Sequence, residues 1–495
     1  MRRAVLIALL LALMTPLTAL GVNQPVRYYM PGTGENIDPA VIEAGNRKMN
    51  EDGLNLELSV HFIPWDDWET EIHAMIDRSQ EFELFLIMQD LIPYSTYQGE
   101  GSLRPLSELI SKFGPALTDL FWSEVWQCAT QQNAVYVVPA QWRDASGDMQ
   151  GLISIRQDKL DGAGLSIDEA DLSIDGLIDT LAQLQAAWGE DETPYVWDHS
   201  LRRPPVVFHR TYNSWPFYVS WDGLFRVDQD GHASAYFLSE EFKRDCSYYA
   251  RMYSLGLIHP DILSLPSEVK TAADKSGNLL AGFDTVQEDG EAELKLIIPH
   301  LDIKTYRPAP KKPVLMSMPM LNANAVPITA RHPEAGIRFL NWLYSRKENH
   351  DLLIYGIEGT HYIRTEKRYI KSALNPKTGK MLHRFDYWMI GYNGFALYEE
   401  GTPQSVIDDW SDCTSDYVVS PVMGFSFQSE ALWQRYARIT DAYNQWILPI
   451  KLGVVDYDTH IDAAIAAMED AGIHTLVYEY QRQLDKYRAE RYHRP

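Results

Sequence analysis

The feature that most constrains the fold is an alternation of strand and helix patterns in the first hundred residues. Val26–Met30 is a short apolar segment that ends in a turn, and Asp38 followed by Pro39 predicts the start of a helix that runs to about Asn50. From Leu54 to Phe62, apolar residues alternate with polar ones, which is the period of a strand with one buried face. These segments predict a strand, a helix and a second strand.

A second helix and a third strand follow. Apolar residues recur at spacings of three and four between Trp68 and Ile76, which predicts a helix with one apolar face. Leu84–Met88 is a continuous apolar run of strand length, as expected for a strand that is buried on both faces. The order strand, helix, strand, helix, strand predicts a parallel sheet joined by right-handed crossovers. The predicted fold class is therefore α/β.

Turns at one edge of this sheet are the first candidates for a binding site, because parallel sheets bind ligands beyond the carboxyl ends of their strands. The turns there are Pro31–Glu35, Pro64–Asp67 and Gln89-Asp90. The candidate ligand-binding residues in these turns are Trp65, Asp66, Gln89 and Asp90.

Aromatic residues beside hydrogen-bonding residues are the positive functional signal, and the chain contains 14 Trp and 28 Tyr. A sugar ring has an apolar C–H face and a rim of hydroxyls, so its site needs flat aromatic surfaces bordered by Asp, Asn, Gln or Arg. The same mixture occurs after a predicted strand at Val135–Val138 and within an aromatic stretch near residue 215. Polar residues also follow two apolar or small-residue segments in the second half of the chain. The candidate ligand-binding residues there are Trp142, Arg143, Asn213, Trp215, Asp284 and Asn322. The opposing interpretation is that these rings fill the core.

The remaining patterns predict a second α/β region and a helical end. A helix is predicted from Ile174 to Trp188, with Gly189 as its stop, and later helices at Pro333–Tyr344, Ser429–Ile447 and Thr459–Arg491. A chain of 495 residues exceeds what one hydrophobic core serves, so two or three domains are expected.

The first residues predict export. Arg2 and Arg3 precede an apolar run from Ala4 to Leu20, and small residues follow at the positions that a signal peptidase reads, so we predict a signal peptide over residues 1–21, cleaved near Gly21. The alternative is an uncleaved membrane anchor. Because Val22 stands where a lipid-anchored Cys would follow, no lipid anchor is expected. The predicted location is periplasmic or extracellular.

The charge argues against two classes of partner. The chain has a formal net charge of −24, which repels phosphate backbones and anionic lipid, so we expect no nucleic-acid partner and no direct membrane insertion. The three cysteines, Cys128, Cys246 and Cys413, are too few for a disulfide framework. Cys246 falls on the apolar side of a helical pattern, which predicts core packing.

Most catalytic signatures are missing from the sequence. It has no dinucleotide-binding or phosphate-binding glycine loop, no His-Glu-x-x-His helix and no Gly-x-Ser-x-Gly elbow. We therefore expect no catalytic residue, no metal and no cofactor. Glycoside hydrolysis stays open as an alternative, because it needs only two carboxylates at the right separation.

Four segments carry a resemblance to a known family: Gly256–Asp261, Gly336–Tyr344, Tyr355–Tyr362 (Tyr-Gly-Ile-Glu-Gly-Thr-His-Tyr), and Ala471–Ile473 with Glu479–Asp485. They resemble the large bacterial extracellular solute-binding proteins that serve ABC importers, in the long, lipoprotein-type branch associated with complex saccharides. The Tyr-Gly-Ile-Glu-Gly segment is the most specific of them. With the N-terminal α/β pattern, the likeness spans nearly the whole chain after the signal peptide.

The resemblance implies a two-lobe periplasmic-binding-protein-like fold with a ligand cleft between the lobes. Lobe one is expected to contain residues 22–139 and about 281–345, and lobe two residues 140–280 and about 346–495. It implies a monomer that captures a carbohydrate, an oligosaccharide in particular, and delivers it to the permease subunits of an ABC importer. The alternatives are an exported glycoside hydrolase or lyase, and a peptide-binding protein on the same scaffold.

Overall fold

The structure, a computed structural model, describes most of the chain. The described residues are 23–89, 92, 94–121, 123–140, 151–189, 193–198, 201–284, 295, 298, 300–317, 320–404, 407–408, 417–428 and 432–492. The predicted signal peptide lies outside them. Within these ranges, no helix is long and apolar enough to cross a membrane.

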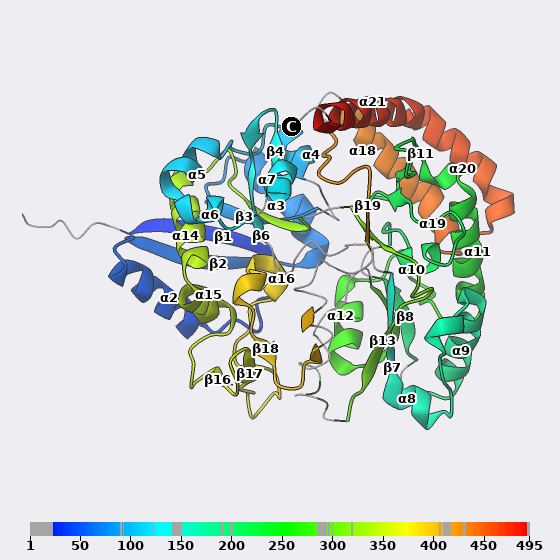
Figure 1. Cartoon of the computed structure of the whole chain (residues 1–495), viewed down its shortest axis with the longest axis horizontal. Helices are drawn as coiled ribbons and strands as arrows, with labels where there is room; N and C mark the ends of the chain where they lie inside the picture. Colours follow the sequence, from blue (N-terminus) through cyan, green and yellow to red (C-terminus); the bar gives the residue numbers. More distant parts are fainter. Residues whose placement is uncertain are drawn as a thin grey trace, which may run out of the picture.

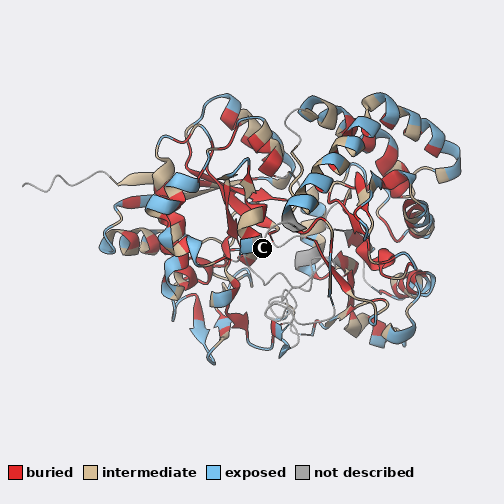
Figure 2. Ribbon diagram, turned by 45° about the horizontal axis from the view of Figure 1, so that its top comes forward, coloured by how far each residue is buried: buried red, intermediate tan, exposed pale blue. Residues whose placement is uncertain are grey.

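The chain forms two lobes, each with its own sheet and its own hydrophobic core (Figure 1). Buried residues gather inside each lobe, and exposed residues cover the outer helices (Figure 2). The predicted two-lobe α/β fold is confirmed.

Lobe one is built on a five-stranded sheet with the strand order β2-β1-β3-β15-β6. The first three strands are parallel, as the N-terminal alternation predicts, and β15 runs antiparallel to both of its neighbours. The strands are β1 (Gln24–Pro31), β2 (Leu56–Ile63), β3 (Leu84–Met88), β6 (Val137–Ala140) and β15 (Asn322–Ala325).

Helices cover this sheet, and a small second sheet extends the lobe (Figure 1). At the first helix, the side chain of Asp38 accepts a hydrogen bond of 2.8 Å from the backbone N–H of Ala40, which confirms the predicted N-cap. The helices are α2 (Pro39–Glu51), α3 (Trp68–Asp77), α4 (Tyr94–Gly99), α5 (Ser107–Phe113), α6 (Pro115–Thr118), α7 (Ser123–Cys128), α14 (Pro333–Ser345), α15 (Lys347–Ile354) and α16 (Tyr387–Ile390). The short strands are β4 (Thr130–Gln131), β5 (Ala134–Val135), β16 (Tyr362–Arg364), β17 (Tyr369–Ser372) and β18 (Tyr398–Glu399).

Lobe two is built on a four-stranded sheet with the order β13-β7-β12-β8, beside a three-stranded antiparallel sheet of β9, β10 and β11. The strands are β7 (Leu152–Arg156), β8 (Tyr195–Asp198), β9 (Tyr218–Val219), β10 (Phe225–Val227), β11 (Ala233–Ala235), β12 (Leu279–Asp284) and β13 (Ile303–Tyr306). The helices are α8 (Gln157–Gly162), α9 (Ile174–Ala186), α10 (Val206–His209), α11 (Glu240–Ser254), α12 (Ser267–Ser276), α18 (Trp433–Ala442), α19 (Leu448–Lys451), α20 (Tyr457–Ala471) and α21 (Ile473–Tyr492). Cys246 on α11 is buried in the core of this lobe, as predicted.

The helical end differs from the prediction in one respect. A single helix was expected over Thr459–Arg491, but α20 ends at Ala471, Gly472 caps it, and α21 begins at Ile473. Gly472 has φ 98°, a left-handed conformation that glycine adopts without strain and that ends a helix. The break lets two helices of moderate length pack on the same core.

The positions at which the chain crosses from one lobe to the other also differ from the prediction. We expected residues 281–345 in lobe one and 346–495 in lobe two. Instead, β12 and β13 pair with β7 and belong to lobe two, whereas buried residues of 346–404, together with Ile407, pack into the core of lobe one. The chain returns to lobe one only at β15, because that strand completes the first sheet between β3 and β6.

The last two segments in which the chain crosses from one lobe to the other lie next to each other. Strand β14 (Val314–Met316) pairs in parallel with β19 (Tyr417–Val419), and the N–H of Ser420 donates a 2.8 Å hydrogen bond to the carbonyl of Met316. Figure 1 shows β19 between the two lobes. These strands tie together the segments that a movement of one lobe against the other would bend.

Candidate functional site

Two pockets lie between the lobes, each with walls from both. The first, here called the β1 pocket, has a volume of about 360 Å³. Its walls are the turns after β1 and β2, the segment from Lys380 to Met389, and α12 of lobe two. Its lining residues are Pro31, Gly32, Thr33, Gly34, Glu35, Asn36, Ile37, Phe62, Pro64, Trp65, Glu268, Thr271, Ala272, Lys380, Arg384, Phe385, Asp386 and Met389.

The second, here called the aromatic pocket, has a volume of about 100 Å³ and a high content of aromatic rings. Lobe one contributes residues that follow β3 and residues of α7, and lobe two contributes the β9–β10 turn and the C-terminal segment. The lining residues are Gln89, Ser95, Thr96, Cys128, Tyr218, Ser220, Trp221, Asp222, Phe225, Ser317, Val422, Phe425, Ser426, Phe427, Tyr436 and Tyr480.

The turns of the β1 pocket lie side by side because β1 and β2 end in register, with Pro31 opposite Ile63. The turn after β1 rests on the ring of Phe62, and a Cβ at Gly34 would lie 2.4 Å from Cδ2 of that ring. Gly34 also has a positive φ of 67°. Only glycine therefore fits there without displacing the Phe62 ring.

A pair of partly exposed tryptophans lies beside the β1 pocket, and Trp65 is the member of the pair that lines it. Trp65 follows β2, and its ring lies 5.9 Å from that of Trp388, with an interplanar angle of 32°. Asn322 at the start of β15 donates a 2.9 Å hydrogen bond to the carbonyl of Trp388. Asn322 thus positions Trp388 and with it the tryptophan pair.

Two buried histidines hold the segment that brings Arg384 and Asp386 to the β1 pocket. The Nδ1 of His383 accepts a hydrogen bond from the N–H of Asp38 (3.1 Å), and its Nε2 lies 2.9 Å from the carbonyl of Leu353. The Nε2 of His361 lies 3.1 Å from a carboxylate oxygen of Asp38. Burial lowers the pKa of His383 to about 4, so the ring is neutral at physiological pH.

In the aromatic pocket, the turn Ser220–Leu224 presents Asp222. The Asp222 carboxylate accepts hydrogen bonds from the Ser220 hydroxyl, from the Leu224 N–H (3.0 Å) and from the Tyr436 hydroxyl. A Cβ at Gly223 would lie 2.7 Å from the hydroxyl of Tyr443, which comes from the π-helical turn Tyr443–Ile447. The close approach requires glycine and fixes the turn against the C-terminal helices.

The rings of the aromatic pocket are arranged around Tyr480 of α21. Tyr480 stacks on Phe225 with ring centroids 4.1 Å apart, and the rings of Phe425 and Phe427 each lie 5.2 Å from it. Phe425, Phe427 and Tyr436 are partly exposed. They give a ligand an apolar surface beside the hydroxyls of Ser220 and Ser426.

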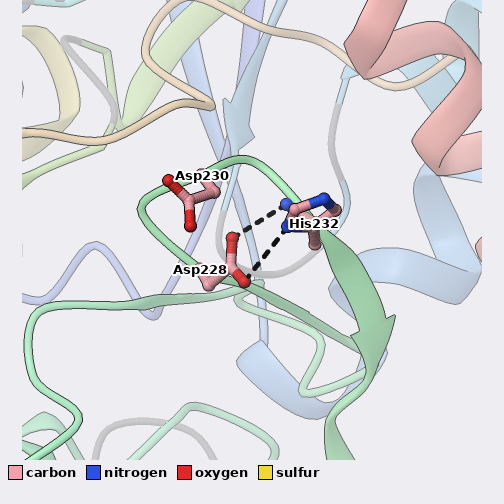
Figure 3. A group of neighbouring side chains, drawn as sticks. All are labelled: Asp228, Asp230 and His232. Carbon is pink, nitrogen blue, oxygen red and sulfur yellow. Dashed lines mark hydrogen bonds and ion pairs between the residues drawn. The ribbon is translucent and has the colours of Figure 1, made fainter.

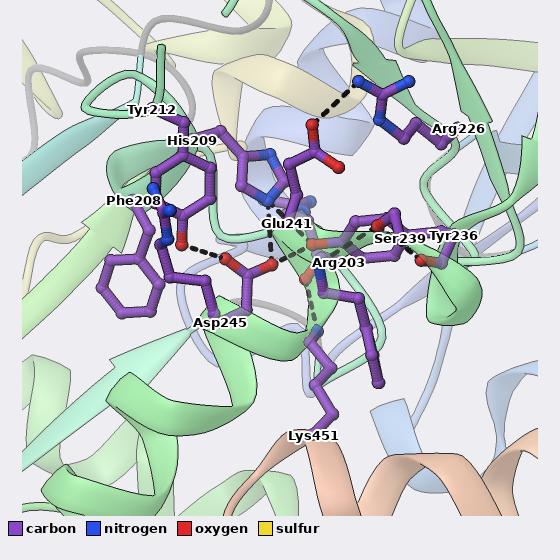
Figure 4. Close-up of polar contacts among 12 residues, drawn as sticks. Arg203, Phe208, His209, Tyr212, Arg226, Tyr236, Ser239, Glu241, Asp245 and Lys451 are labelled. Carbon is purple, nitrogen blue, oxygen red and sulfur yellow. Dashed lines mark hydrogen bonds and ion pairs between the residues drawn. The ribbon is translucent and has the colours of Figure 1, made fainter. Parts of the chain in front are cut away.

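A buried polar network supports the pocket from inside lobe two (Figure 4). The fully buried Asp245 accepts hydrogen bonds from the hydroxyls of Tyr212 (2.7 Å) and Tyr236, and its carboxylate lies 2.9 Å from Nε2 of His209. Burial and the Asp245 carboxylate raise the pKa of Tyr212 well above its usual value, so this hydroxyl stays protonated.

A second part of this support is a buried lysine. Lys451 on α19 donates hydrogen bonds of 2.7 and 2.6 Å to the carbonyls of Leu201 and Arg203. The guanidinium of Arg203 in turn lies 4.8 Å from the centre of a Trp221 ring. The loop near residue 201 and the pocket turn are thereby fixed to α19.

One hydrogen bond connects the lobes at the edge of the aromatic pocket. The amide of Gln131, at the end of β4 in lobe one, donates a 2.9 Å hydrogen bond to the Ser426 hydroxyl. Ser426 therefore contacts both the pocket and the opposite lobe.

Of the sequence-predicted residues, Trp65 and Gln89 line pockets. Gln89 is buried, and its side-chain oxygen accepts a hydrogen bond of 2.9 Å from the N–H of Tyr94. Asp66 is exposed in a 3₁₀ turn and lines neither pocket. Asn322 acts through Trp388, as described above. Asp90, Trp142 and Arg143 lie outside the described residues, and Asp284 ends β12 with its side chain outside the description.

The predicted residues Asn213 and Trp215 line neither pocket. Trp215 is buried in the core of lobe two, and its Nε1–H donates a 2.9 Å hydrogen bond to the carbonyl of Pro313. Asn213 is exposed in the preceding turn and lines neither pocket. The same aromatic stretch does supply lining residues, but they are Tyr218, Trp221 and Phe225. Sequence alone did not separate these rings from Trp215, because all have similar polar neighbours.

The residues that sequence reasoning missed come from the last third of the chain. Trp388, Phe425, Phe427 and Tyr436 are far in sequence from the strand ends that suggested a site. Nothing in their local patterns distinguishes them from core residues.

One group of side chains has the composition of a metal site (Figure 3). Asp228, Asp230 and His232 lie in the turn between β10 and β11, and one possible ligand atom from each lies within 4.8 Å of the others. The N–H of His232 donates a 2.9 Å hydrogen bond to Asp228, and its Nδ1 lies 3.4 Å from the same carboxylate. These contacts account for the arrangement of Asp228 and His232 as an ordinary hairpin turn.

The two lobes, the paired crossing strands and the cleft between them make up a two-lobe fold that the chain shares with solved structures of solute-binding proteins. A family model described as a domain of unknown function (DUF3502) matches residues 421–489. This stretch contains Phe425, Phe427, Tyr436 and Tyr480, so the matched domain supplies much of the aromatic pocket.

Comparisons with a curated protein and with solved structures support this fold. The chain is 20% identical over 474 residues to a carbohydrate ABC transporter substrate-binding protein of Streptococcus pneumoniae, covering 93% of this chain and 90% of that protein. The solved structure of the N-glycan transport solute binding protein (NgtS) of S. pneumoniae, in complex with Man5GlcNAc, matches with a TM-score of 0.77 at 18% identity, covering 94% of this chain and 99% of NgtS. A solute binding protein from Bifidobacterium longum infantis, described as binding HMO, matches with a TM-score of 0.64 at 14% identity, covering 94% and 99% of the two chains.

Proposed function

We propose that this protein is the solute-binding component of an ABC importer and that it binds a carbohydrate, an oligosaccharide in particular, between its lobes. It acts outside the cytoplasm as a monomer and delivers the ligand to permease subunits. The observation that carries the proposal is that both pockets combine partly exposed aromatic rings with hydrogen-bonding groups and take their walls from both lobes. The names of the similar proteins support a carbohydrate as the ligand.

The chemistry of the walls matches a sugar. The C–H faces of sugar rings pack on flat aromatic surfaces such as those of Trp65 and Trp388, and hydroxyls bond to carboxylate, amide and hydroxyl groups such as Asp222 and Ser220. A ligand that contacts both lobes stabilises the closed arrangement, and this stabilisation follows mass action.

The first experiment identifies the ligand. Protein purified without refolding is denatured, and the released small molecules are analysed by mass spectrometry. In parallel, melting temperatures are measured with panels of oligosaccharides and peptides. We expect stabilisation by saccharides. Stabilisation by peptides alone would replace the proposal with a peptide-binding function.

A second experiment tests the site. Trp65→Ala removes half of the tryptophan pair, and we expect it to weaken oligosaccharide binding by about tenfold, since an aromatic contact of this kind is worth roughly 1.4 kcal/mol. Trp446→Ala is the matched control, because Trp446 is 40% exposed and lines neither pocket. Equal affinities in calorimetry for both variants would remove the β1 pocket from the site.

Binding without catalysis is part of the proposal. Asp222, the carboxylate of the aromatic pocket, already accepts three hydrogen bonds, and Glu35 at the β1 pocket is 2.7 Å from the amine of Lys380. Purified protein incubated with polysaccharides should therefore release no new reducing ends. Sustained release would contradict the proposal in favour of a glycoside hydrolase.

A further inference from the structure

The charges on the walls of the cleft are unevenly distributed. Among the described residues that line the aromatic pocket, Asp222 is the one charged side chain, and none is Lys, Arg or His. The β1 pocket adds three carboxylates, those of Glu35, Glu268 and Asp386, against the two cations Lys380 and Arg384. Both pockets thus carry an excess of negative charge.

Asp222 is contacted by hydrogen-bond donors. All three groups that contact it are donors: the Ser220 hydroxyl, the Leu224 N–H and the Tyr436 hydroxyl. Burial and the nearby Asp222 charge raise the pKa of Tyr436 well above its usual value, so that hydroxyl keeps its proton and continues to donate. Hydrogen-bond donors therefore surround the Asp222 carboxylate at the aromatic pocket.

Three cations near the cleft contact other groups of the protein. Arg203 lies against the Trp221 ring at 4.8 Å, and the buried Lys451 holds the carbonyl of that same Arg203 at 2.6 Å (Figure 4). At the other pocket, Lys380 forms an ion pair of 2.7 Å with Glu35. An acidic ligand would have to compete with these partners for a counter-charge.

We propose that the cleft selects uncharged saccharides and rejects those that carry uronate or sialic-acid carboxylates. This selectivity rests on the proposed carbohydrate-binding function and adds a property to it. A ligand carboxylate in the aromatic pocket would face Asp222 with no cation among the described lining residues, and like charges about 7 Å apart at an effective dielectric constant of about 20 reduce affinity by about tenfold or more. The net charge of −24 adds a repulsion at longer range.

The test uses sugar pairs that differ in one carboxylate. A glycan array presents neutral oligosaccharides of mannose, glucose, galactose and N-acetylhexosamines beside their uronate or sialylated counterparts, and calorimetry at physiological ionic strength gives the affinities of the pairs that bind. We expect the neutral member to bind about tenfold tighter or more. An acidic member that binds equally well or better overturns the selectivity and leaves the proposed function intact. Binding to no saccharide on the array overturns the proposed function itself.

Two variants locate the origin of the selectivity. Asp222→Asn keeps the shape and an acceptor oxygen but removes the charge, and Glu268→Gln removes a carboxylate from an exposed position on α12, where the fold is not at risk. We expect each to raise the affinity for the acidic member relative to the neutral one, by about tenfold for Asp222→Asn and by less for Glu268→Gln. Glu108→Gln, an exposed residue on α5 outside both pockets, makes the same change in net charge and is the control. Equal ratios in all three variants would contradict a local origin in the cleft.

Discussion

The two lobes build their halves of the cleft in different ways. In lobe one, the main wall comes from turns that directly follow neighbouring parallel strands, such as Pro31–Glu35 after β1. In lobe two, the wall joins residues more than two hundred positions apart, since Asp222 meets Tyr436 and Gly223 meets Tyr443. The difference teaches that the first wall depends on local chain geometry and the second on the packing of the whole lobe. Changes inside lobe two should therefore disturb stability and binding together.

The largest expected effect is at the buried network of lobe two. Asp245→Ala leaves the hydroxyls of Tyr212 and Tyr236 and the ring of His209 without their shared acceptor, and we expect a loss of about 4 kcal/mol in the free energy of unfolding. Urea unfolding measures it. The control Asp175→Ala removes an exposed partner of Arg251, where a loss of about 0.5 kcal/mol is expected. Similar losses in the two variants would show that the network does not support lobe two.

The second-largest expected effect is a loss of stability on replacing a glycine in lobe two, compared with a glycine in lobe one. Gly223→Ala places a Cβ 2.7 Å from the Tyr443 hydroxyl and 2.8 Å from the carbonyl of Arg202, at a φ of 72°. We expect a loss of about 3 kcal/mol from strain and overpacking together, with weaker ligand binding. Gly101→Ala in lobe one has nearly the same φ, 73°, with no atom within 4 Å of the added Cβ, so only about 1 kcal/mol is expected. Calorimetric unfolding and ligand affinity are measured for both variants. If Gly223→Ala changed neither the stability nor the affinity, the pocket turn would not be tightly coupled to the π-helical turn.

The smallest effect is a pH dependence that belongs to lobe one. The pKa of the buried His383 is about 4 in the folded protein, below the usual value of 6.5. A histidine with a lowered folded pKa stabilises the protein above pH 6.5, and this contribution is lost as the pH falls from 6.5 toward 4. Between pH 7 and pH 5.5 we expect a loss of about 1 kcal/mol from this residue.

The variant His383→Gln separates this contribution from the others. Its stability should fall less steeply between pH 7 and pH 5.5 than that of the unchanged protein. His232→Gln is the control, because it removes one imidazole from the exposed β10–β11 turn. Parallel slopes for all three proteins in urea unfolding at both pH values would show that His383 does not titrate below its usual range.

The sequence by itself determined the parts of the fold that rest on local patterns. The period of two in β2, the period of three and four in α3 and the continuous apolar run of β3 follow from which faces must be buried, and these elements form almost at the predicted residues. The position of Trp65 and Gln89 at the edge of the sheet follows from the same rule, because strand ends in a parallel sheet are fixed by the strands themselves.

Only the tertiary structure decided where the chain changes lobe and which aromatic rings face the cleft. Strand β15 belongs to lobe one because its hydrogen-bond partners are β3 and β6, which lie more than 180 residues earlier in the chain. Trp215 and Trp221 have similar neighbours in sequence, yet one bonds to the carbonyl of Pro313 in the core and the other lines the aromatic pocket. The physical reason is that burial of a ring depends on distant segments packing over it, and no local pattern of residues records which segments those are.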